Sequence, residues 1–152
     1  MSVLGTSAGV LLDTNVLSEL MRPAPAASVL AWFAAQRTQT KFLIASVTQA
    51  EILLGIALLP AGKKRTSLAT VAQEMFDQDF HGLTLSFDQH TAPVYASFVA
   101  GRSRSGQPIT VEDAQIAAIA SFHRLPLVTR NTKDFLNLPG LTVVNPWQVT
   151  TK

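Results

Sequence analysis

Short apolar runs alternate with longer amphipathic stretches along the chain, and this alternation sets the expected elements. The apolar runs are typical of buried parallel strands, which are hydrophobic throughout because both of their faces are covered. On this pattern we expect strands at residues 9–13, 42–45, 83–85, 127–129 and 141–144.

The segments between these runs carry apolar residues at helical spacing. Residues 63–80 are the clearest case, because Leu68, Val71, Ala72 and Met75 recur on one face. Prolines and glycines mark most breaks between these segments, and residues 101–108 form the one clear flexible loop. The remaining helices are expected at residues 16–21, 26–36, 46–59 (capped by Ser46 or Thr48), 88–100 and 110–123 (capped by Thr110), with a turn or short helix at 131–136.

Strands that alternate with helices predict an α/β fold. We expect a three-layer domain in which a central parallel sheet of about four to five strands is covered by helices on both faces. A chain of 152 residues has the size of a single domain, residues 1–152. In such sheets, ligands gather beyond the C-terminal ends of the strands.

Composition narrows the class of protein. Hydrophobic residues make up 47% of the chain and charged residues 14%, which excludes a disordered protein and suits a domain partly covered by a partner chain. No apolar stretch is long enough for a bilayer and no secretory signal is visible, so we expect a cytoplasmic protein that does not contact membranes. The absence of cysteine excludes disulfides and a thiolate zinc site, and the three histidines share no ligand spacing.

Two acidic residues are candidates for a catalytic or metal-binding site. Asp13 stands at the end of the first expected strand, although it could also serve as the N-cap of the next helix. Glu51 is the only charged residue between Lys41 and Lys63, in a helix that is apolar on most sides. A buried carboxylate there needs a partner or a metal ion; the alternative is that Gln49 and Glu51 mark a narrow solvated stripe.

Two further acids follow the same logic. Asp113 shares a helix face with Ile116 and Ala117, although its spacing from Thr110 is also that of a capping box. Asp134 follows the fourth expected strand and would, alone, be an ordinary turn residue.

Together the four acids indicate a single site, because a parallel sheet brings the ends of its strands to one edge. Carboxylates gathered there repel one another unless a divalent cation neutralises them, and oxygen ligands favour Mg²⁺ or Mn²⁺. Such ions activate water for attack at phosphorus. If four of the ten acids collect in one pocket, the remaining surface carries 12 positive charges against six negative ones, which suits a polyanionic substrate.

Four segments in order carry a resemblance to a known family: residues 11–16 (LLDTNV), 48–55 (TQAEILLG), 112–117 (EDAQIA) and 127–135 (LVTRNTKDF). With the ending at 144–147 (VNPW), the sequence resembles the PIN-domain ribonucleases, specifically the VapC- and FitB-like toxins of type II toxin–antitoxin pairs. The resemblance covers nearly the whole chain.

The resemblance implies site residues and partners. Asp13, Glu51 and Asp113 would be the main Mg²⁺ ligands, directly or through water, with Asp134 as the fourth catalytic acid. It further implies endonucleolytic RNA cleavage, dimerisation, and neutralisation by a small DNA-binding antitoxin whose tail fills the acidic groove. The supporting residues would be Thr14, Asn15, Thr129, Asn131 and Glu112, the last of which could replace its neighbour Asp113 in the alignment.

Basic residues and competing functions complete the expectations. A catalytically degenerate PIN-fold module that only binds RNA or protein is the alternative, although the intact set of acids argues against it. A phosphohydrolase is a third possibility, but Asn15 stands where that class has a second Asp. The candidates for phosphate contact are Arg102, Arg104, Arg130 and Lys133; residues 63–65 are better read as solvated surface.

Overall fold

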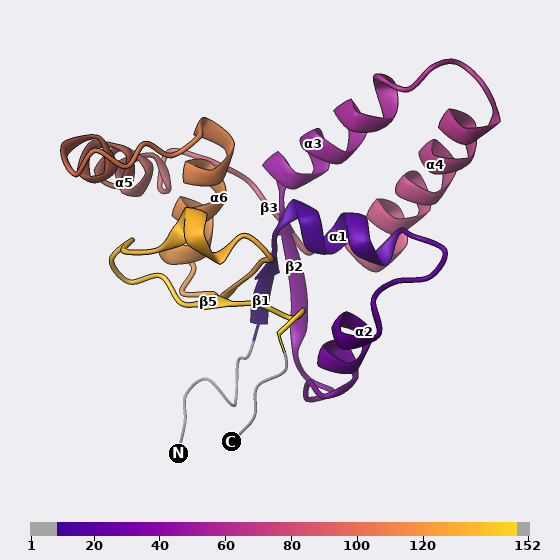
Figure 1. Cartoon of the computed structure of the whole chain (residues 1–152), viewed down its shortest axis with the longest axis horizontal. Helices are drawn as coiled ribbons and strands as arrows, with labels where there is room; N and C mark the ends of the chain where they lie inside the picture. Colours follow the sequence, from indigo (N-terminus) through magenta and orange to yellow (C-terminus); the bar gives the residue numbers. More distant parts are fainter. Residues whose placement is uncertain (1–8, 149–152) are drawn as a thin grey trace.

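A five-stranded sheet in which all strands are parallel forms the centre of the computed structural model, which describes residues 9–148 (Figure 1). The strand order is β3-β2-β1-β4-β5, so β1 lies in the middle. This arrangement confirms the α/β fold predicted from the sequence. The strands are β1 (Gly9–Leu12), β2 (Lys41–Ala45), β3 (Thr84–Leu85), β4 (Leu127–Val128) and β5 (Val143–Val144).

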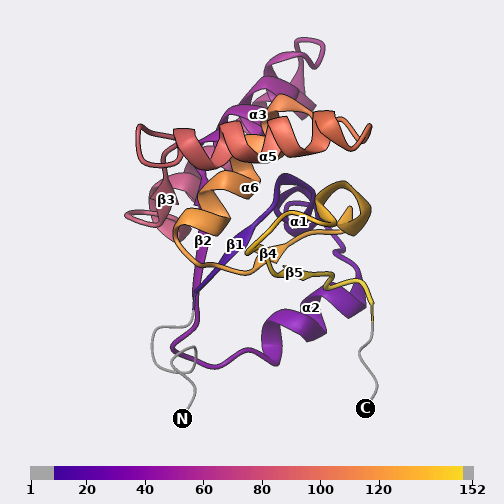
Figure 2. The same cartoon turned by 90° about the vertical axis from the view of Figure 1, so that its left-hand side faces the viewer.

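Helices cover both faces of the sheet. Helices α5 and α6 lie on one side, nearest the viewer in Figure 2, and α1, α2 and α4 lie on the other. Within residues 9–148, no helix has the length and apolar character needed to cross a membrane. The helices are α1 (Thr14–Leu20), α2 (Ala27–Ala34), α3 (Ser46–Ala57), α4 (Lys63–Glu74), α5 (Ala92–Arg104) and α6 (Val111–Phe122), with a π-helical turn at Met75–Asp79 and a 3₁₀ turn at Thr132–Phe135.

Strand β1 separates two hydrophobic cores. Val10 and Leu12 contribute to the core beneath α1 and α4, whereas Leu11 contributes to the core beneath α5 and α6. The side chains divide in this way because successive residues of a strand point to opposite faces. With both faces buried, the end of β1 has little freedom, and the residue that follows it is held in a fixed place.

Helix α5 departs from the prediction at both ends. The helix begins at Ala92 rather than at residue 88, because the Asp88 carboxylate accepts hydrogen bonds from the backbone N–H groups of His90 (2.9 Å) and Thr91 (3.2 Å) and forms a turn. It continues to Arg104, so the first half of the loop predicted at 101–108 is helical. Gly106, at φ 73°, lies beyond the helix end.

The helices on either side of the α3–α4 connection also differ from the prediction. The N-cap of α3 is Ala45, so the predicted capping by Ser46 or Thr48 is wrong. Thr48 instead is fully buried, with its hydroxyl 3.2 Å from that of Thr14. The helix predicted at 63–80 is regular only to Glu74 and ends in the π-helical turn.

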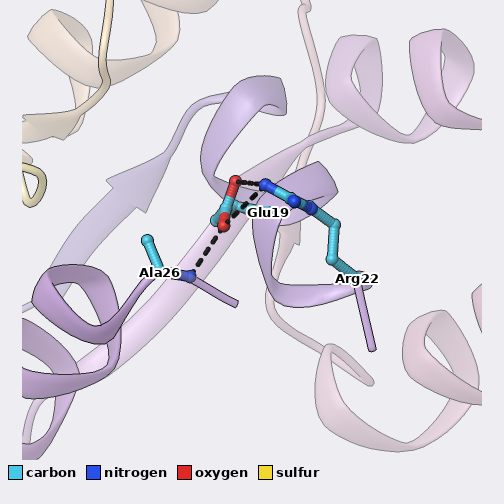
Figure 3. A network of polar contacts seen from close by, with 3 residues as sticks. All are labelled: Glu19, Arg22 and Ala26. Atoms are coloured by element: carbon cyan, nitrogen blue, oxygen red, sulfur yellow. Dashed lines mark hydrogen bonds and ion pairs between the residues drawn. The ribbon is translucent and has the colours of Figure 1, made fainter. Parts of the chain in front are cut away.

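A buried carboxylate joins the first two helices (Figure 3). Glu19 lies 3.2 Å from the Arg22 guanidinium and accepts a 2.7 Å hydrogen bond from the backbone N–H of Ala26. These contacts lower the pKa of Glu19, the backbone hydrogen bond from Ala26 most of all. These contacts therefore hold residues 22–25, where the sequence predicts a break between two helices, in one conformation.

Candidate active site

Asp13 lies directly after β1 and is 4% exposed. Its Oδ1 accepts a 2.8 Å hydrogen bond from the Thr14 backbone N–H, so it also caps α1, as the alternative reading expected. Its Oδ2 accepts hydrogen bonds from the Thr129 hydroxyl (2.7 Å) and the Asn15 side-chain amide (3.2 Å). Burial raises the pKa of Asp13 and the charge of Asp134 adds to the rise, while these three hydrogen bonds oppose it.

Thr129 connects the ends of β1 and β4. It directly follows β4, which pairs with β1, and its hydroxyl accepts hydrogen bonds from the Asn15 amide and the Asn131 backbone N–H, both at 3.1 Å. The Asn15 side-chain oxygen in turn accepts a 3.1 Å hydrogen bond from the backbone N–H of Arg130. Three of the expected supporting residues therefore form one network that fixes the Asp13 carboxylate.

Glu51 approaches the same edge from α3. Its carboxylate is half-buried and accepts a hydrogen bond from the hydroxyl of Thr14, the first residue of α1. Burial raises the pKa of Glu51, the Thr14 hydrogen bond opposes this, and the charges of Asp13 and Glu112 raise it further. The sequence analysis did not assign Thr48 to the site, although its hydroxyl contacts that of Thr14. The available signal was its position three residues before Glu51, on the same face of the helix.

Asp113 is placed by the N-terminus of α6. Thr110 caps this helix by accepting a 3.1 Å hydrogen bond from the Asp113 backbone N–H, which confirms the predicted cap. The pKa of Asp113 is raised to about 6, mainly by burial and then by the charges of Asp13, Asp134 and Glu51, against an opposing hydrogen bond from Thr110. Asp134 is exposed, in the 3₁₀ turn that follows β4.

The four predicted acids thus lie within electrostatic reach of one another. Within residues 9–148, no three Asp, Glu, His or Cys side chains are arranged so that they could hold a metal ion directly. The donor set consists of carboxylate and hydroxyl oxygens, which fits Mg²⁺ or Mn²⁺ bound through one or two carboxylates and several waters. The identity of the cation stays a prediction.

The sequence profile of the PIN domain matches residues 10–141. This chain belongs to the PIN-domain family. A VapC ribonuclease of Sinorhizobium fredii is 39% identical over 139 residues, covering 91% of this chain and 98% of that protein. The toxin FitB of Neisseria gonorrhoeae is 38% identical over 138 residues, with 91% and 98% covered.

Solved structures agree with this PIN domain in fold. The structure of FitAB bound to a DNA fragment matches with a TM-score of 0.84 and 35% identity, covering 93% of this chain and 98% of that one. A toxin–antitoxin complex from Klebsiella pneumoniae matches with a TM-score of 0.65 and 28% identity, covering 92% and 99%.

The predicted phosphate-binding cations of the PIN domain fall into two groups. Lys133 and Arg130 are exposed beside the acids, and the Arg130 guanidinium stacks 5.0 Å from the Trp147 ring. Arg104 is exposed at the end of α5. The prediction for Arg102 is wrong, because its side chain is buried and its guanidinium is bonded to backbone carbonyls rather than presented to a substrate.

Proposed function

We propose that this PIN domain is a Mg²⁺- or Mn²⁺-dependent endoribonuclease and the toxin of a toxin–antitoxin pair. The observation that carries the proposal is the charge-coupled group of Asp13, Glu51, Asp113 and Asp134 at the C-terminal edge of the sheet. A relative named as a VapC ribonuclease supports the activity, and a relative named as the toxin FitB supports the toxin role.

Each acid has a distinct place in this proposal. Asp13 is best suited to bind the cation, since its buried carboxylate is held by three hydrogen bonds. Glu51, oriented by Thr14, and Asp113 would complete the binding group, at least one of them through water. When bound, Mg²⁺ or Mn²⁺ would offset negative charge on the scissile phosphate and make water a stronger nucleophile.

Exposed basic side chains near the acids are placed to contact the phosphates of RNA. Lys133 and Asp134 both line a pocket of about 340 Å³ beside Asp113. A cation at its rim attracts a phosphate of RNA towards the acids, which would otherwise repel it. The exposed Arg130, placed beside Asn15 by its backbone, is positioned to do the same on the other side of the site.

The direct test is cleavage of end-labelled RNA by the purified protein with Mg²⁺, with Mn²⁺ and with EDTA. We expect metal-dependent cleavage that falls by about two orders of magnitude or more in Asp13→Asn. Asp79→Asn, which removes an exposed acid outside the site, is the matched control and should cleave like wild type. RNA binding without cleavage by folded wild-type protein would favour the non-catalytic binding module instead.

The antitoxin partner rests on the toxin–antitoxin neighbours and on exposed apolar surface. Leu54 on α3 is 59% exposed and Leu58, at the C-terminal end of this helix, is 74% exposed, which suits a surface covered by a partner chain. Induction of the protein should stop growth, and co-expression of a small reading frame encoded next to it should restore growth. Normal growth on induction, with the protein present at high level, would contradict the toxin assignment.

A further inference from the structure

Arg102 is buried although it lies on the same helix as the exposed Arg104. Its side chain is 6% exposed, and its Nη2 donates hydrogen bonds of 2.8 Å to the backbone carbonyls of Asp134 and Leu136. Its Nη1 donates a weaker, 3.4 Å hydrogen bond to the carbonyl of Gln107. The Nε atom is buried without a partner among residues 9–148, so the described contacts are all made by the two terminal nitrogens.

The three carbonyls belong to two segments that carry catalytic acids. Gln107 lies in the segment that leads into Thr110, the cap of the helix bearing Asp113. The Asp134 and Leu136 carbonyls lie in and just after the 3₁₀ turn. Both segments line the pocket of about 340 Å³ that contains Asp113 and Asp134, and Arg102 lines it as well. The guanidinium therefore bridges the two sides of this pocket.

We propose that Arg102 is a positioning residue that fixes Asp134 relative to Asp113. This inference rests on the proposed nuclease function. A guanidinium suits the task because its planar fork directs several N–H donors along fixed directions, whereas an ammonium is a compact point charge. Lysine at this position keeps the charge but cannot reach both segments in the same geometry, so Asp134 should shift without loss of the fold.

The first test measures, without relying on activity, whether Arg102 holds these two segments in place. Amide hydrogen exchange is compared for wild type, Arg102→Lys and Arg104→Lys, the last being the control on an exposed arginine of the same helix. We expect exchange in residues 130–138 to rise about tenfold or more in Arg102→Lys and to stay unchanged in Arg104→Lys. Equal exchange in that segment for all three proteins would overturn the proposal, whether or not the protein cleaves RNA.

The second test asks whether Arg102 acts through Asp134. In the cleavage assay, Arg102→Lys should lower kcat by about tenfold to a hundredfold with KM within a factor of two, because misplaced catalytic groups slow the chemical step. In the Asp134→Asn background, measured by single turnover with excess protein, the same substitution should have no further effect. Additive losses, or a general fall in stability with exchange raised throughout the chain, would assign Arg102 a purely structural role.

Arg102→Gln provides a second variant in case the lysine protein is poorly folded. It removes the charge and keeps one short donor, so local exchange in residues 130–138 should again rise before global unfolding. If wild-type protein does not cleave RNA, the nuclease proposal fails. The exchange data still decide whether Arg102 holds residues 130–138 in place.

Discussion

Replacing Asp113 with asparagine should stabilise the metal-free protein while abolishing cleavage. Burial and the neighbouring acids raise the pKa of Asp113 from 3.8 to about 6, so the folded state favours its protonated form. Well below pH 3.8 the group is protonated in both the folded and the unfolded chain and costs the folded state nothing. As the pH rises from about 4 to about 6, the unfolded chain has released this proton while the folded chain still holds it, so the folded state loses stability until the loss is complete above pH 6.

The size of this effect follows from the shift. About two pKa units correspond to roughly 3 kcal/mol at 1.36 kcal/mol per unit. Asp113 is only half-buried, and solvent screening reduces the figure to roughly 1–2 kcal/mol. For a chain of this length, the melting temperature of Asp113→Asn at pH 7.5 should exceed that of wild type by about 2–8 °C.

The assay is thermal unfolding in EDTA from pH 4 to pH 8, with Asp79→Asn as the exposed control. The difference between Asp113→Asn and wild type should be small near pH 4 and reach its full value above pH 6. Addition of Mg²⁺ should raise the wild-type melting temperature more than that of the variant, since the cation neutralises the same charge. A variant less stable than wild type at pH 7.5, or a difference independent of pH, would refute the reasoning.

Three further substitutions test other parts of the structure. Thr129→Val removes a hydrogen bond that opposes the raised pKa of Asp13, so the acidic limb of the pH–rate profile should move to higher pH, whereas Thr142→Val should leave it in place. Glu19→Gln should lower the melting temperature at pH 7 more than at pH 3, because a lowered pKa stabilises the fold only above the ordinary range of the group and the contribution is lost as the pH falls. Thr110→Ala should cost about 1 kcal/mol in urea unfolding through loss of the helix cap, and an unchanged midpoint would show that the cap contributes nothing.

Local patterns were sufficient to predict the strands and the residues that follow them. The apolar run ending at Asp13 and the one ending at Thr129 each mark a strand, and parallel pairing brings their ends together. Glu51 was predictable because an isolated charge in an apolar helix needs a partner. In these cases a few neighbouring residues contain the information, since side-chain period and burial decide the outcome.

The parts that could not be predicted depend on contacts between distant segments. Arg102 looked like a surface cation because it lies in a polar run containing glycine and serine, yet carbonyls 32 and 34 residues away bind it. Thr48 looked like a cap and is instead buried against Thr14, 34 residues earlier. The spacing of Thr48 from Glu51 indicates a shared helix face, but no local pattern identifies the distant partner of either Thr48 or Arg102.

The hydrogen bonds around the acids divide them into two kinds with different consequences for stability. Asp13 is the more deeply buried, yet three donors reach its carboxylate and offset part of the cost of ionising it there. The raised pKa of Asp113 is opposed only by the hydrogen bond from Thr110, and the charges of three other acids add to the effect of desolvation. In the metal-free protein, ionisation of Asp113 should therefore weaken the fold near neutral pH with little compensation, whereas three hydrogen bonds offset part of the cost at Asp13. A divalent cation bound at Asp13 would also lower the cost of ionising Asp113, which lines the pocket that Arg102 bridges.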